Sequence, residues 1–139
     1  TDAATERFHT LAGDIQQTEA ELSRVSDLMA AVVQYAKTRP AFDGYKAAKY
    51  SRKYLAEHEA ELADYRAAKA TMAELLGGEK LPKMDVLKEK RRQLAARKKA
   101  LYLEYRKAQQ DMRELVAVKG SVDHLRGLTD NQRNKEQAR

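Results

Sequence analysis

Residues 83–125 read KMDVLKEKRRQLAARKKALYLEYRKAQQDMRELVAVKGSVDHL, and an apolar side chain recurs in this stretch at every seventh position. The repeated positions are Leu87, Leu94, Leu101, Ala108, Leu115 and Val122. A seven-residue apolar repeat places its members along one stripe of an α-helix, which is the pattern of a coiled-coil seam. The spacing therefore predicts a long helix over residues 83–126, with Pro82 as a favourable residue at its start.

A second heptad seam lies near the beginning of the chain. Its members, with Thr18 filling one place, are Phe8, Leu11, Ile15, Leu22, Val25, Met29, Val32 and Ala36. This seam predicts a helix over residues 2–38, ended by Arg39-Pro40 because the residue before a proline avoids the α region. Between the two seams we expect a helix over residues 51–76, with Ser51 as its N-cap and Gly77-Gly78 as its stop.

The overall composition agrees with a purely helical fold. The 139 residues include six Gly and two Pro, too few for the many turns of a β protein. Three helices joined by short connections predict an all-α fold, an elongated antiparallel three-helix coiled-coil bundle over residues 1–128. Residues 129–139 are polar, lack an apolar period, and are expected to form a flexible tail.

Several classes of protein do not fit the sequence. Without cysteine there is no disulfide framework and no thiolate metal site, which is consistent with a cytoplasmic protein. The longest apolar run, residues 28–33, is far too short to cross a membrane. His9, His58 and His124 show no metal-ligand spacing, and no nucleotide-binding or hydrolase motif is present. We therefore expect no enzymatic activity, cofactor, metal or small-molecule substrate. The chain opens with Thr1 inside an apparent helix, so we expect it to be part of a larger protein.

The charges are sorted into blocks. Residues 37–53 hold six basic and one acidic side chain, and residues 80–107 hold eleven basic and three acidic ones. Residues 1–36 and 54–79 each hold six acidic and two basic side chains. The blocks can pair within the fold, yet a net charge of +6 remains for an external polyanion.

The first basic block carries interleaved aromatic residues near a helix start. Basic side chains neutralise phosphates and aromatic rings stack on bases, which makes this block a candidate nucleic-acid site. Its candidate residues are Lys46, Lys49, Tyr50, Arg52, Lys53 and Tyr54. The alternative interpretation is that the tyrosines close the end of the bundle while the lysines are only solvated.

The second basic block projects one stripe beside the long helix's seam. Helical spacing places Lys88, Arg92, Lys99 and Arg106 on this stripe, and they are the second set of candidate DNA-binding residues. Arg91 and Lys98 point nearer the seam, where they need acidic partners or room to extend to solvent. The alternative is that the block is neutralised internally. The candidate acidic partners are Glu19, Glu21, Glu57, Glu61 and Asp64.

The ordered segments of residues 38–128 resemble the C-terminal helical region of relaxases, the mobilisation nucleases of conjugative and mobilisable elements of Gram-positive bacteria. The resemblance is carried by TRP at 38–40, YKAAKYSRKYLAEHEAE at 45–61, KLP at 80–82, YLEYRKA at 102–108, MREL at 112–115 and VKGSVDHL at 118–125. It implies a bacterial cytoplasmic parent protein that nicks DNA at a transfer origin with a tyrosine and a histidine-bound metal. None of those catalytic motifs occurs in this chain.

The resemblance thus implies an accessory, non-catalytic role. The region would position transfer-origin DNA, or it would bind a relaxosome accessory protein or the coupling protein of the secretion channel. A second hypothesis is a coiled-coil module for homo-oligomerisation or protein docking without DNA contact. A third is an unrelated coiled coil that shares only its composition with relaxases.

Overall fold

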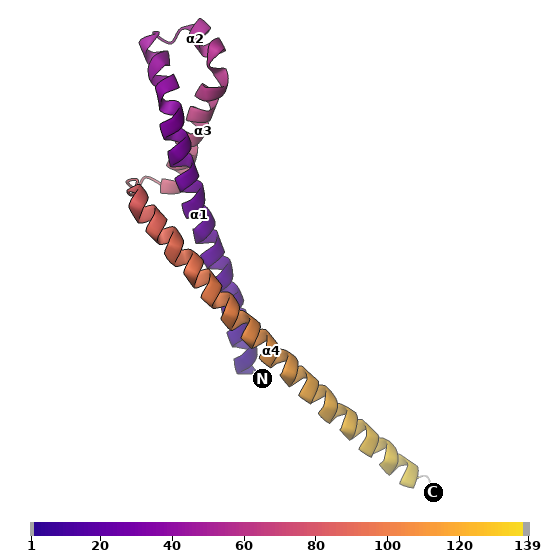
Figure 1. The fold of residues 1–139 in the computed structure, drawn as a ribbon. Helices are drawn as coiled ribbons and strands as arrows, with labels where there is room; N and C mark the ends of the chain where they lie inside the picture. The colour runs from indigo at the N-terminus through magenta and orange to yellow at the C-terminus, as the bar shows by residue number, and fades with distance from the viewer. Residues whose placement is uncertain (1, 138–139) are drawn as a thin grey trace. The chain divides into compact units, whose positions relative to one another are not determined.

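The computed structural model describes residues 2–137, with side chains placed for residues 2–122 and 124–127. Its helices are α1 (Asp2–Ala47), α2 (Arg52–Glu57), α3 (Glu59–Leu76) and α4 (Met84–Gln137), shown in Figure 1. No strand occurs within residues 2–137, which confirms the predicted all-α class. The chain groups into two compact units: unit 1, formed by residues 1–17 and 98–139, and unit 2, formed by residues 18–97.

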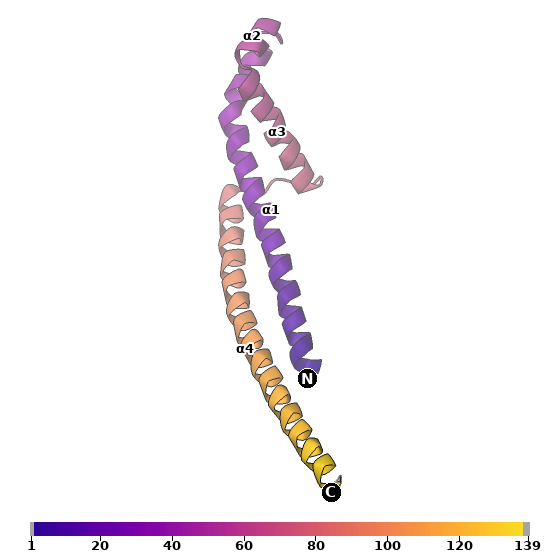
Figure 2. The same ribbon diagram turned by 90° about the vertical axis from the view of Figure 1, so that its right-hand side faces the viewer.

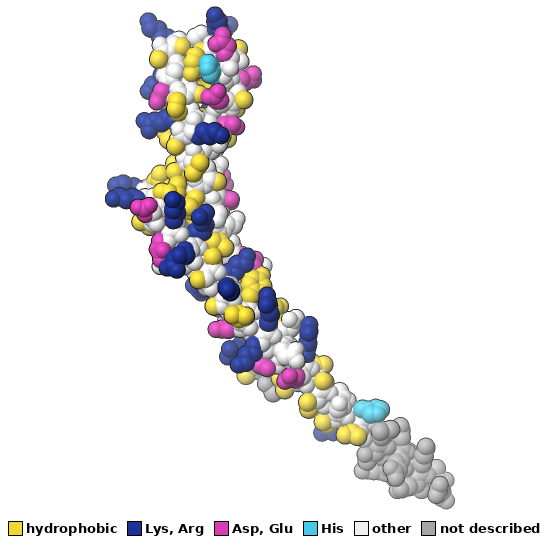
Figure 3. Space-filling view, viewed as in Figure 1, with side chains coloured by type: hydrophobic (Ala, Val, Ile, Leu, Met, Phe, Trp, Pro, Cys, Tyr) yellow, Lys and Arg dark blue, Asp and Glu magenta, His cyan; other side chains and the backbone are white. Residues whose placement is uncertain are grey.

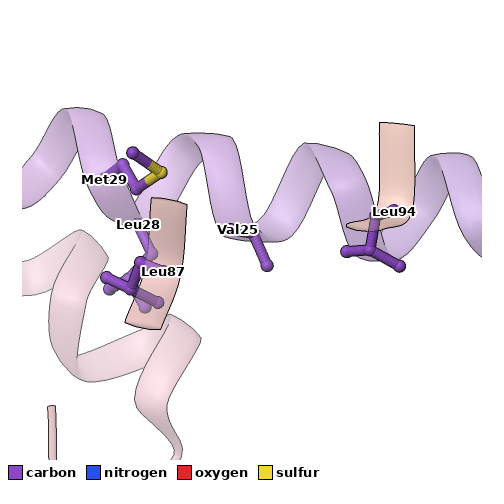
Figure 4. Packing of buried hydrophobic residues seen from close by; sticks show 5 residues of the cluster. All are labelled: Val25, Leu28, Met29, Leu87 and Leu94. Atoms are coloured by element: carbon purple, nitrogen blue, oxygen red, sulfur yellow. The ribbon is translucent and has the colours of Figure 1, made fainter. Parts of the chain in front are cut away.

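The core of unit 2 forms where α1 meets the start of α4. Its buried members, seen in Figure 4, are Val25, Leu28, Met29, Leu87 and Leu94. Half-buried apolar side chains from the end of α3, including Met72, Leu75 and Leu76, pack against this cluster. Full burial of one such side chain contributes about 1.5–3 kcal/mol, so these contacts hold three helices together within the unit.

In unit 2, α1 and α3 also form a hairpin, with α2 at the end where the chain reverses (Figures 1 and 2). Arg24, early in this part of α1, donates a hydrogen bond to the carbonyl oxygen of Leu75 near the end of α3. Phe42, near the end of α1, stacks on Tyr65 in the middle of α3 at a centroid distance of 4.4 Å. Because the contacts run in opposite order along the two helices, the helices run in opposite directions.

Unit 1 joins the first turns of α1 to the later part of α4. Leu11 and Ile15 of α1 and Ala108 of α4 are buried. The rings of Phe8 and Tyr105 stack at a centroid distance of 4.8 Å and an interplanar angle of 27°. Three seam residues are thus buried in this unit, and Phe8 of the first seam stacks on Tyr105, which lies beside the α4 seam.

Burial along the seams follows the heptads with informative exceptions. The first seam is confirmed by its buried members Leu11, Ile15, Thr18, Val25 and Met29. At its end Ala36 is exposed. Along α4, Leu87, Leu94 and Ala108 are buried, whereas Leu115 and Val122 are exposed. Along the α4 seam, exposure begins at Leu115, which lies beside the first residues of α1.

The predicted end of the first helix at Pro40 is wrong, because α1 continues through Pro40 to Ala47. A proline inside a helix removes one hydrogen bond and costs about 3 kcal/mol. Residues just past the proline are packed, since Ala41 is buried and Phe42 stacks on Tyr65. In addition, Thr38 is buried and its hydroxyl donates to the carbonyl of Gln34 at 2.8 Å. The packing of Ala41 and Phe42 and the local bond of Thr38 together offset the cost of the proline.

The predicted helix over residues 51–76 is divided at His58. This residue has φ −123° and ψ 25°, ends α2 and precedes α3. Ser51 is the N-cap as predicted, and its hydroxyl accepts from the backbone N–H of Tyr54 at 3.4 Å. Gly77 is the predicted stop, in the left-handed conformation with φ 55° and its N–H bonded to the Ala73 carbonyl at 3.1 Å.

The third helix also extends past its predicted end near residue 126. The backbone of α4 is helical to Gln137 and continues through Gly127, so residues 129–137 are helical where we expected a flexible tail. A helical glycine costs only about 1 kcal/mol relative to alanine and stops a helix only when it turns left-handed. Residues 138–139 of the expected tail lie outside the described residues.

Candidate nucleic-acid interface

The first basic block lies on the turn that joins α1 to α2. The N–H of Tyr50 bonds to the Tyr45 carbonyl and the N–H of Lys49 bonds to the Lys46 carbonyl, both at 2.9 Å. This pair of bonds is the Schellman motif, which ends a helix with a left-handed residue that is usually glycine. Here Lys49 and Tyr50 take that conformation instead, with φ 57° and 59°. The turn therefore presents two large side chains at a cost in backbone strain.

We predict that Lys49→Gly raises the free energy of unfolding by about 0.5–1 kcal/mol, because glycine adopts the left-handed conformation without a Cβ clash. Urea denaturation followed by circular dichroism measures the change. Lys69→Gly is the control, since Lys69 is exposed within α3 and the same substitution there should lower stability by about 1 kcal/mol. A loss of stability in Lys49→Gly would contradict the strain assigned to the turn.

Aromatic side chains cluster at this turn and between α1 and α3. Tyr65 stacks on Phe42 at 4.4 Å and on Tyr35 at 5.1 Å between ring centroids. Nearer the turn, Tyr45 meets Tyr50 edge to face at 5.2 Å. Such contacts each add about 0.5–1.5 kcal/mol beyond the area they bury. Most of these rings are thus used to join α1 to α3.

Tyr54 is fixed by several contacts. Its hydroxyl donates to the Ala41 carbonyl at 2.8 Å, and its ring stacks on His58 at 4.0 Å and on Tyr45 at 6.0 Å. Nδ1 of His58 lies 3.0 Å from the Tyr54 carbonyl oxygen, which favours the tautomer with the proton on Nδ1. His58 is half-buried and packed, as predicted. Tyr54 therefore serves packing, in agreement with the structural interpretation of the tyrosines.

The remaining candidates on the turn face solvent. Tyr50 is 58% exposed, although its edge-to-face contact with Tyr45 orients the ring. The exposed basic side chains around it, named here the turn set, are Lys46, Lys49, Arg52 and Lys53. Lys46 Nζ lies 6.0 Å from the centroid of the Phe42 ring, at the outer limit of a cation–π contact. The turn thus combines four exposed positive charges with one accessible aromatic ring.

In unit 2, α4 contributes basic side chains from its first turns. Lys88, Lys90, Arg91 and Arg97 are exposed. Arg92 forms a two-pronged pair with Glu89, with Nη2–Oε1 at 2.6 Å and Nε–Oε2 at 3.0 Å. This pair lowers the pKa of the Glu89 carboxyl and raises the pKa of Arg92. The charge of Arg92 is therefore shared with a carboxylate on its own helix.

In unit 1, α4 carries a further group of basic side chains. Lys99, Arg106 and Lys107 are exposed, whereas Lys98 is half-buried and has an interaction partner. This difference agrees with the prediction that Lys98 points nearer the seam. Figure 3 shows dark blue Lys and Arg side chains at intervals along the visible face of α4.

The positions of the acidic side chains show how far they neutralise the basic block of residues 80–107. Of the expected acidic partners, Glu21, Glu57, Glu61 and Asp64 are exposed, while Glu19 is half-buried and engaged. No described carboxylate lies within ion-pair distance of Lys88, Lys99 or Arg106. These three α4 residues, named here the helix set, keep their charge available to solvent.

Tyr65 is the tyrosine whose environment changes its ionisation. A hydrogen bond with Tyr35, followed by burial, raises the pKa of the Tyr65 hydroxyl above its usual 10.0. The raised pKa means that the folded state favours neutral Tyr65. Its contribution to stability is complete below pH 10 and is lost as the pH rises through the raised pKa. Tyr65 therefore stays neutral to a higher pH than an unperturbed tyrosine does.

The described residues form neither a metal site nor a membrane span. No group of three or more His, Cys, Asp or Glu side chains within the described part of the chain is arranged to hold a metal ion. Across the same residues, no helix combines the length and apolar character needed to span a bilayer.

Comparisons with known proteins extend this description no further. No protein-family model matches the chain, and searches of curated proteins and of solved structures found no match. The exposed basic and apolar side chains are therefore the features from which a function can be inferred.

Proposed function

We propose that this chain is a non-catalytic helical region of a conjugative-element relaxase that binds DNA through the phosphate backbone in the bacterial cytoplasm. The observation that carries the DNA-binding proposal is the helix set, since Lys88, Lys99 and Arg106 are exposed with no described carboxylate in ion-pair distance. The assignment to relaxases rests on the sequence resemblance. A role in positioning transfer-origin DNA for relaxosome assembly is consistent with both DNA binding and the relaxase assignment.

The chemistry of the candidate residues favours phosphate over base recognition. Exposed Lys and Arg side chains neutralise phosphates and release counterions, which gives sequence-tolerant binding that weakens steeply with salt. Tyr50 adds one ring that can stack on an unpaired base. Tyr54 is withdrawn from the stacking role because it is packed against His58 and Ala41.

We also propose the architecture that the heptads predicted, an antiparallel coiled coil of α1, α3 and α4. Support within unit 2 comes from the opposite order of the α1–α3 contacts and from the shared cluster of Val25, Leu28 and Leu87. Within unit 1, support comes from Phe8 of the first seam, which stacks on Tyr105 of α4.

Fluorescence anisotropy of labelled single-stranded and duplex DNA, titrated at about 50–300 mM salt, tests DNA binding. The variant Lys88→Glu/Lys99→Glu/Arg106→Glu should bind at least about tenfold more weakly at low salt, and the slope of log K against log salt should fall by about 3 units. A second variant with the turn set changed to Glu determines whether that turn also contacts DNA. Tyr50→Ala should weaken binding of the single strand more than that of the duplex.

The charge-matched control is Arg66→Glu/Lys69→Glu/Arg113→Glu, three exposed residues outside both sets. Three reversals of two units each take the formal net charge from +6 to 0 in either triple variant. If the control loses as much affinity as the helix-set variant, only net charge matters and no site exists. Failure of the wild-type chain to bind either DNA at low salt would refute the proposal.

A second candidate function is favoured by a specific observation. Large apolar side chains on α4 in unit 1 are exposed, among them Leu115, Val116, Val118 and Val122. A seam that continues past its internal partner is typical of a dimerisation or docking module. This function does not require DNA contact and would leave the basic side chains as a solvated surface.

A further inference from the structure

Within unit 1, the apolar residues beside the α4 seam move from one side of the seam to the other. They are Tyr105 and Met112 on the first side and Val118 and Leu125 on the second. Tyr105 of α4 stacks on Phe8 of α1, and a groove of about 330 Å³ lies between the two helices beyond this pair. The groove is lined by Ala4, Thr5, Met112, Leu115, Val116, Val118 and Lys119. Ala4 and Thr5 of α1 thus lie beside Met112, Leu115 and Val118 of α4.

From Leu115 onward the apolar residues occupy two adjacent rows of the helix, heptad positions a and d. Leu115, Val118, Val122 and Leu125 are spaced by three, four and three residues, the spacing of heptad positions a, d, a and d. They are named here the C-terminal stripe. Upstream, the positions three residues after Leu101 and Ala108 hold Glu104 and Asp111, so this d row is apolar only from Val118 on. The exposed fractions of Leu115, Val118 and Val122 are 44%, 62% and 41%.

The charges beside the C-terminal stripe favour pairing with a second copy of the chain in parallel orientation. With Leu115 at a, Glu114 is at position g and Lys119 is at position e. In a parallel pair of identical helices, g of one helix meets e of the other five residues further on, so Glu114 would face Lys119 of the second copy twice by symmetry. An antiparallel pair would instead set e against e and g against g, which brings like charges together.

We propose that the C-terminal stripe forms a parallel two-stranded coiled coil with a second copy of this chain. Val122 at a with Leu125 at d is the combination that favours two parallel strands, whereas Leu115 at a with Val118 at d is the reverse combination, so the strand number is also measured in the experiment below. Association would cover apolar side chains that the described part of the chain leaves exposed. Because the seam is only about two heptads long, dissociation constants on the order of 10–100 µM are expected.

Sedimentation velocity on the full chain, from about 5 to about 500 µM and without DNA, tests the dimer. We expect a concentration-dependent dimer in the wild type. Val118→Glu should weaken it by at least about tenfold, because a charge enters position d. Val116→Glu is the matched control, since Val116 is 68% exposed but occupies position b, away from the stripe. It should change the dissociation constant by less than about twofold.

Charge exchange tests the orientation. Glu114→Lys should weaken the dimer by about 2–5-fold, and Glu114→Lys/Lys119→Glu should restore it, because the exchange recreates both opposite-charge pairs. Far-UV circular dichroism confirms that each variant keeps its helix content. The proposal is overturned if the wild type stays monomeric at the highest concentration, if both valine variants dimerise equally, or if Glu114→Lys has no effect. None of these outcomes depends on DNA binding.

Discussion

Replacing Leu62 by alanine is expected to lower the free energy of unfolding by about 2–5 kcal/mol. Leu62 lies in the first half of α3 and is 1% exposed, the deepest large side chain in the described part of the protein. Its neighbours on the same face, Tyr65 and Ala68, are also buried. Truncation removes the transfer energy of the missing atoms and leaves a cavity, because aromatic stacking between α1 and α3 restricts local collapse.

Urea denaturation monitored by circular dichroism at 222 nm measures the loss for Leu62→Ala, with helicity as the signal. Leu103→Ala is the control, since Leu103 is 59% exposed on α4 and the same atoms are removed there at little cost, within about 0.5 kcal/mol. Equal losses in the two variants would show that helix propensity, rather than burial of Leu62, determines the effect.

Gly44→Ala is expected to destabilise the protein by about 1–3 kcal/mol, although alanine is the better helix former. A Cβ at Gly44 would lie 2.9 Å from Cζ and 3.2 Å from Cε2 of Tyr54, closer than van der Waals contact allows. The Tyr54 ring has little freedom to move, since its hydroxyl bonds to the Ala41 carbonyl and its ring stacks on His58. The added methyl group must therefore break one of these contacts.

Gly13→Ala is the matched control for Gly44→Ala, because Gly13 also lies within α1 and a Cβ there would have no atom within 4 Å. This variant should be more stable than the wild type by up to about 1 kcal/mol. The two substitutions thus have opposite expected signs in the same denaturation experiment. Stabilisation by both would mean that the Tyr54 ring rearranges freely.

Part of the candidate interface could be predicted from the sequence. The exposure of Lys46, Lys49, Arg52 and Lys53 follows from the cost of burying charge, which any fold must avoid. The different roles of Tyr50 and Tyr54 could not be predicted, because both belong to the same basic and aromatic block. Tyr54 reaches Ala41, thirteen residues earlier, through the chain reversal at α2. That contact exists only after α1 and α3 have come together.

The sequence by itself determined that this protein is helical and which of its residues form the apolar seams. Heptad spacing placed Leu11, Val25, Leu87 and Leu94 in the interior, because a 3.5-residue repeat buries one stripe of a helix in any coiled coil. Gly77 ended α3 because of a conformational preference that is local to one residue.

Only the tertiary structure decided where α1 ends and which part of the α4 seam stays exposed. Pro40 is a local stop signal, and the packing of Ala41 and Phe42 overrides it. Leu94 and Leu115 are equivalent in the heptad, yet only Leu94 is buried. Burial requires a second surface as well as an apolar side chain, and the heptad pattern alone does not show where that surface lies.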